Sequence, residues 1–122
     1  MTININSKDK VTQYRDYVNF LHPLFKVSPQ ERDVLAMLIQ RYNDIGSEVS
    51  NPAFVNKLLF NTDTRNEIAE KLDMSKIRYD GIIIKFRKMK LISGKTLNDK
   101  IIPKIKDGII AVNVVINEKP KV

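Results

Sequence analysis

The sequence of 122 residues predicts a mainly α-helical α+β fold with a small β-hairpin toward its C-terminal end. Apolar residues recur three or four positions apart in successive stretches, as in helices with one buried face. Residues typical of helix starts precede several of these stretches. After Gly94 the pattern changes to a β-branched one around the turn pair Asp107-Gly108. The length is that of about one domain.

Residues 1–27 are expected to form an N-terminal extension with a short strand and a helix. "TININ" alternates like a strand, and helical spacing of apolar residues runs from Asp9 to Phe20. Pro23 is expected to end this helix. Its apolar side chains are candidates for dimerisation or partner docking, with packing into the core as the alternative; they are Tyr14, Tyr17, Val18 and Leu21.

The next helix has the clearest start signal. Ser28 is the expected N-cap, Pro29 occupies the first helical position, and Glu31 completes a capping box. Gly46 is the expected stop. The stripe expected to be buried comprises Val34, Leu35, Leu38, Ile39 and Tyr42.

Three further helices are predicted. Asn51 and Pro52 begin a short one that ends at about Phe60. Thr64 and Glu67 are expected to form a second capping box. After the break at "DMS", Ser75 caps a helix that runs to about Lys90. At 100° per residue, one side of this last helix is a core face and the other points outward; the core face holds Tyr79, Ile82, Ile83, Phe86 and Met89, and the outward side holds Ile77, Gly81, Ile84 and Lys88.

The positive charge is concentrated in one segment. Residues 76–106 contain ten basic and two acidic residues, whereas the net charge of the whole chain is +7. A basic surface attracts polyanions, most commonly nucleic acid. The alternative is an ordinary lysine-rich surface in contact with solvent.

Residues 28–116 resemble a winged helix-turn-helix domain, of the kind found in small phage-encoded DNA-binding proteins. "SPQERDVLAMLI" and "RNEIAEKLDMSKIRYDGIIIKFRKMKLI" carry the resemblance. Ala69 matches the small residue where two helices cross, and Leu91-Ile92 matches the apolar pair that leads into the wing. The family often has glycine where this chain has Asp73 and Lys90. Residues 117–122 are expected to be a polar tail.

The resemblance implies binding of double-stranded DNA, as a transcription regulator or in another DNA transaction. Lys76 and Arg78 would then approach guanine acceptors or phosphates, and Ile77 or Ile84 a thymine methyl group. Asp80 counts against this interpretation because it repels phosphate. The phosphate contacts would come from Lys85, Arg87, Lys88 and Lys90 on the helix, and from Lys95, Lys100, Lys104 and Lys106 in the wing.

A second interpretation uses the same fold for protein contacts. Exposed Ile77 and Ile84 would then be buried against another copy or a larger assembly. The chain would be a structural or adaptor protein, for example a virion component.

An enzyme, a cofactor and a small-molecule substrate are not expected. The chain has no cysteine and a single histidine, His22, which we expect to be packed or half-exposed rather than a metal ligand. No apolar run approaches the roughly 18 residues that span a bilayer, and residues 1–10 lack a signal-peptide core. We therefore expect no membrane contact and a cytoplasmic location, in the host cell if the chain is phage-encoded, with the virion as another possible location.

Overall fold

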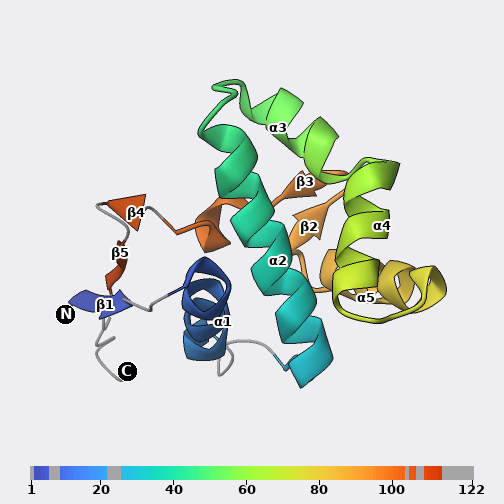
Figure 1. The fold of residues 1–122 in the computed structure, drawn as a ribbon, viewed down its shortest axis with the longest axis horizontal. Coiled ribbons are helices and arrows are strands. Elements are labelled where there is room, and N and C mark those ends of the chain that lie inside the picture. The colour runs from blue at the N-terminus through green and yellow to red at the C-terminus, as the bar shows by residue number, and fades with distance from the viewer. Residues whose placement is uncertain (1, 6–8, 22–25, 104, 107–108, 114–122) are drawn as a thin grey trace, which may run out of the picture.

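The computed structural model describes residues 2–5, 9–21, 26–103, 105–106 and 109–113. Within this described part the chain is mainly helical, with short antiparallel strands, so the predicted α+β class is confirmed (Figure 1). The elements are β1 (Thr2–Ile5), α1 (Lys10–Leu21), α2 (Pro29–Gly46), α3 (Pro52–Leu59), α4 (Thr62–Lys71), α5 (Lys76–Lys88), β2 (Ile92–Ser93), β3 (Thr96–Leu97), the short 3-10 helix η2 (Asp99–Ile101), β4 (Ile105–Lys106) and β5 (Ile109–Asn113). His22, Lys104, Asp107, Gly108 and the expected tail 117–122 lie outside the described residues.

Helix α2 runs through the middle of the molecule and begins as predicted (Figure 1). The Ser28 hydroxyl accepts from the Glu31 backbone N–H at 3.2 Å, and the Ser28 N–H donates to the Glu31 carboxylate at 2.7 Å. Both bonds satisfy groups that a bare helix start leaves without partners. The expected stripe is buried except for Tyr42, which is half-buried.

Helix α1 packs against α2, and this packing corrects the prediction for its apolar residues. Tyr14 and Val18 are completely buried, Tyr17 is nearly so, and Leu21 is half-buried against the same core. The Tyr17 hydroxyl donates to the Ile101 carbonyl at 2.7 Å, and burial raises the pKa of Tyr17 to about 12. These four side chains belong to the core of the chain, so they do not offer an exposed surface for dimerisation or docking.

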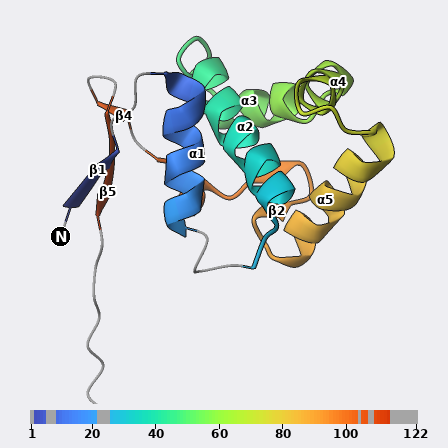
Figure 2. The same ribbon diagram turned by 60° about the horizontal axis from the view of Figure 1, so that its bottom comes forward.

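The strands form two separate sheets in the described part of the chain, and only one contains the predicted hairpin. β4 and β5 pair antiparallel on either side of Asp107-Gly108, with Ile105 opposite Ile110. β1 adds to this hairpin in the order β1-β5-β4, with Ile3 opposite Val112. This sheet and α5 lie on opposite sides of α1 (Figure 2). The hairpin predicted as the wing therefore does not lie beside α5.

A second, smaller hairpin follows α5 directly. β2 pairs with β3, Ile92 opposite Leu97 and Ser93 opposite Thr96. The buried amide side chain of Asn56 on α3 accepts from the Leu97 backbone N–H at 2.9 Å and so attaches the hairpin to the helices. The sequence interpretation missed this hairpin because its strands are two residues long.

Residues of the expected N-terminal extension pair and pack with the rest of the chain. β1, from residues 1–27, pairs with β5, and α1 packs on α2. No helix within the described ranges is both long and apolar enough to cross a bilayer.

Candidate functional site

Helices α4 and α5 form the centre of the candidate site, joined by a short turn. α4 begins one residue after its cap, Asn61, whose side chain accepts from the Thr64 N–H at 2.8 Å. The predicted capping box of Thr64 and Glu67 is therefore wrong. The Thr64 hydroxyl donates to the Leu58 carbonyl at 3.0 Å, and Glu67 pairs with Arg41 and Lys71 instead.

Two residues at the ends of α4 and α5, Asp73 and Lys90, both adopt left-handed backbone. Asp73 has φ 51° and Lys90 has φ 63°. Met74 N–H donates to the Ala69 carbonyl, and Leu91 N–H donates to the Phe86 carbonyl, each at 2.9 Å. These bonds across the left-handed residue are the signature of a Schellman motif. Each helix therefore ends in the same sharp reversal, and the second one directs the chain from α5 into β2.

Helix α5 has the two faces that the sequence predicted. The core face of Tyr79, Ile82, Ile83 and Phe86 is buried, with Met89 half-buried. On the opposite side, Ile77 is 84% exposed and Ile84 is 50% exposed. Gly81 and Lys88 are exposed on the same side. The outward face is thus apolar at its centre, and both of its isoleucines are at least half exposed.

Asp80 is held by a residue that the sequence interpretation did not single out. Arg65 on α4 donates from Nε and Nη2 to the two Asp80 carboxylate oxygens, at 2.8 and 2.7 Å. Hydrogen bonding to Arg65 lowers the pKa of Asp80, so the carboxylate stays charged but paired. The positions of Arg65 and Asp80 are 15 apart in different helices, so helical spacing within one element could not predict this pair.

The other flank of α5 is attached to the start of α2. Lys85 Nζ donates to the Glu31 carboxylate at 2.7 Å, and Arg78 Nε donates to the Gln30 side chain at 3.0 Å. Burial alone would raise the pKa of Glu31, but hydrogen bonds from Lys85 and Ser28 lower it overall. Lys85, predicted as a phosphate contact, therefore has a partner within the fold.

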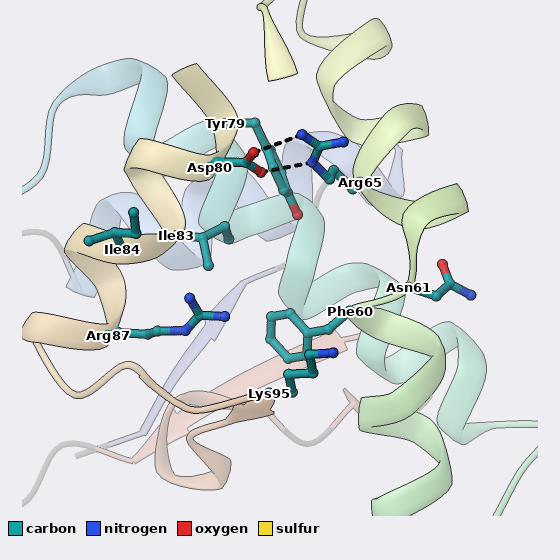
Figure 3. Close-up of a pocket in the computed structure, with 9 residues that line it drawn as sticks. All are labelled: Phe60, Asn61, Arg65, Tyr79, Asp80, Ile83, Ile84, Arg87 and Lys95. Carbon is teal, nitrogen blue, oxygen red and sulfur yellow. Dashed lines mark hydrogen bonds and ion pairs between the residues drawn. The ribbon is translucent and has the colours of Figure 1, made fainter. Parts of the chain in front are cut away.

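The turn of the small hairpin lies beside the outward part of α5. Arg87 Nε donates to the carbonyl of Gly94 at 2.9 Å. Gly94 has φ 63°, a conformation that glycine adopts without strain. Lys95 and Arg87 reach toward the space beside Phe60, and the Arg65–Asp80 pair closes its far end (Figure 3). This hollow is about 180 Å³, smaller than the roughly 300–1,000 Å³ of typical ligand pockets.

The ten predicted DNA-binding residues are divided by the fold. Lys76, Arg78, Lys85, Arg87 and Lys88 lie on α5, and Lys90 and Lys95 lie on the segment that follows it. Lys100 is in η2, Lys104 lies outside the described residues, and Lys106 belongs to the sheet beyond α1. Within the described ranges, no carboxylate forms an ion pair with the exposed cations Lys76, Arg78, Lys88, Lys90, Lys95 or Lys100.

Comparisons of the chain with protein-family models, with curated proteins and with solved structures gave no significant match. Among the described residues, no cluster of three or more His, Cys, Asp or Glu side chains could hold a metal ion. The candidate site is therefore defined by its geometry alone: α4, the turn, α5 and the β2–β3 hairpin.

Proposed function

We propose that this chain binds double-stranded DNA as a winged helix-turn-helix protein. In this proposal α4 and α5 are the helix pair, α5 enters the major groove, and the β2–β3 hairpin is the wing. The biological role would be transcription regulation or another DNA transaction, and for a phage-encoded chain it would take place in the cytoplasm of the host cell.

One observation carries the proposal: cations that have no carboxylate partner among the described residues surround an outward-facing helix. Lys76, Arg78 and Lys88 lie on the outward side and flanks of α5, and Lys90 and Lys95 continue the series into the hairpin. Cations without carboxylate partners are available to neutralise phosphates and release counterions. Asp80, the acidic residue that weakens the sequence argument, is neutralised by Arg65.

The test is a titration of a fluorescent duplex with wild type and two matched double variants. Lys88→Ala/Lys95→Ala removes two unpaired cations from the proposed surface. Lys10→Ala/Arg15→Ala removes the same charge from α1, where both residues pair with aspartates. At about 50 mM salt we expect binding that the first variant weakens at least tenfold and the second leaves within a fewfold. Equal losses in both variants would show non-specific attraction by net charge and would contradict the proposed surface.

A second candidate function is supported by the exposure of Ile77. An apolar side chain that is 84% exposed, on the same face of α5 as the half-exposed Ile84, is also typical of a protein–protein contact. In that function the chain is a structural or adaptor protein, as in a virion. Light scattering of wild type and Ile77→Glu tests this second function. A wild-type assembly that Ile77→Glu dissociates supports protein contact. A monomer mass for both proteins contradicts self-assembly.

A further inference from the structure

The centre of the outward face of α5 is hydrocarbon. Ile77, Gly81 and Ile84 follow one another at intervals of four and three residues, which places them in one line along the helix. We call these three residues the isoleucine stripe. A Cβ added at Gly81 would meet no atom within 4 Å, so no residue of the described chain occupies the space above the stripe there. Gly81 also leaves the backbone open to close approach.

The polar side chains beside the stripe are engaged within the fold. On one flank Asp80 is paired with Arg65, and on the other Lys85 is paired with Glu31. Arg78 donates to the Gln30 side chain. These contacts reduce the number of hydrogen-bonding groups that could reach base edges. Lys76 and Lys88, at the two ends of α5, have no carboxylate partner among the described residues.

The base edges of the major groove include one apolar group, the 5-methyl group of thymine. We propose that the isoleucine stripe recognises thymine methyl groups, an inference that rests on the proposed function. The chain then prefers duplexes rich in A·T pairs because of apolar contacts with these methyl groups and not because of hydrogen bonds. The cations at both ends of α5 fit the two phosphate backbones that border a groove. A duplex therefore matches this face better than an apolar protein partner, which would leave these charges unmatched.

The dimensions of the stripe are compatible with this partner. Ile77 and Ile84 are seven residues apart, or about 10 Å along the helix axis. Successive bases of one strand are about 3.4 Å apart, so this separation corresponds to about three base-pair steps. Two thymines at that spacing could each meet one isoleucine if the helix follows the groove.

Replacement of thymine by uracil isolates the methyl group, because uracil keeps the same backbone and base pairing. The experiment measures binding of wild type to an A·T-rich duplex and to its uracil-containing counterpart. We expect weaker binding to the uracil duplex, by roughly fourfold for each methyl group contacted. Equal affinity for both duplexes would overturn the role of the stripe and leave the proposed function intact. No binding to either duplex would overturn both.

Three single variants locate the effect on the chain. Ile77→Ala should lose part of the preference for thymine, because one of the two side chains that meet methyl groups is shortened. Since Ile77 is 84% exposed, this change should not disturb the core. Phe54→Ala, at a half-exposed apolar position on α3, is the control and should retain the full preference. If Ile77→Ala and Ile84→Ala both keep the wild-type ratio of affinities, the methyl effect arises elsewhere and the inference is wrong.

Discussion

Asp80 on α5 and Arg65 on α4 form a two-point ion pair, with both carboxylate oxygens bound to one guanidinium group at 2.8 and 2.7 Å. This pair neutralises the acidic side chain that α5 itself carries. We expect Arg65→Ala to weaken duplex binding severalfold, because it leaves the Asp80 carboxylate unpaired beside phosphate. Arg65→Ala/Asp80→Ala should recover most of the affinity. Fluorescence anisotropy measures all three proteins, and a double variant as weak as Arg65→Ala would instead make Arg65 a direct contact.

The Glu31–Lys85 pair predicts how stability depends on pH. The folded-state pKa of Glu31 is lowered from 4.5, so its charged form stabilises the fold above about pH 4.5. That contribution disappears as the pH falls through the lowered folded-state pKa. Glu31→Gln should therefore lose less unfolding free energy than wild type between pH 6 and pH 3, as measured by urea denaturation. Glu70→Gln, at an exposed position of α4, is the control and should follow wild type. Identical pH slopes for wild type and Glu31→Gln would refute this account.

The left-handed conformation of Asp73 predicts a stabilising substitution. An L-residue at such a position costs about 1–2 kcal/mol, whereas glycine costs roughly 0.5–1 kcal/mol in lost chain entropy. Asp73→Gly should thus raise the free energy of unfolding by about 0.5–1 kcal/mol in a thermal or urea experiment. Asp63→Gly, in the first turn of α4, should lower it. A fall in stability for Asp73→Gly would mean that the Asp73 side chain contributes a compensating interaction.

Helix starts could be predicted from the sequence where the signal is local and has no competitor. Ser28, Asn51 and Ser75 each cap the helix that the sequence assigns to them. Asn61 and Thr64 are both suitable cap residues and lie only three positions apart. Asn61 is the cap that forms, and Thr64, inside the helix, donates to the Leu58 carbonyl instead. A capping pattern does not reveal a bond of that kind, because it depends on the preceding helix.

The arrangement of the candidate site could be predicted only in part. The core and outward faces of α5 follow from helical periodicity, which is a local property. The pairing of β1 with β5 joins residues about a hundred positions apart, and the Arg65–Asp80 pair joins two helices. Such contacts depend on how elements pack, so spacing along the chain did not reveal that the C-terminal hairpin is separate from α5.

The salt dependence of duplex binding tests the central claim most directly. Five cations of the proposed surface have no carboxylate partner or backbone-carbonyl partner among the described residues: Lys76, Arg78, Lys88, Lys90 and Lys95. If each of them contacts one phosphate, the logarithm of the association constant should fall with the logarithm of salt concentration with a slope of roughly −4.5. Lys88→Ala should reduce the magnitude of that slope by about one. A slope near zero, or no binding at about 50 mM salt, would contradict the proposal that this face binds DNA.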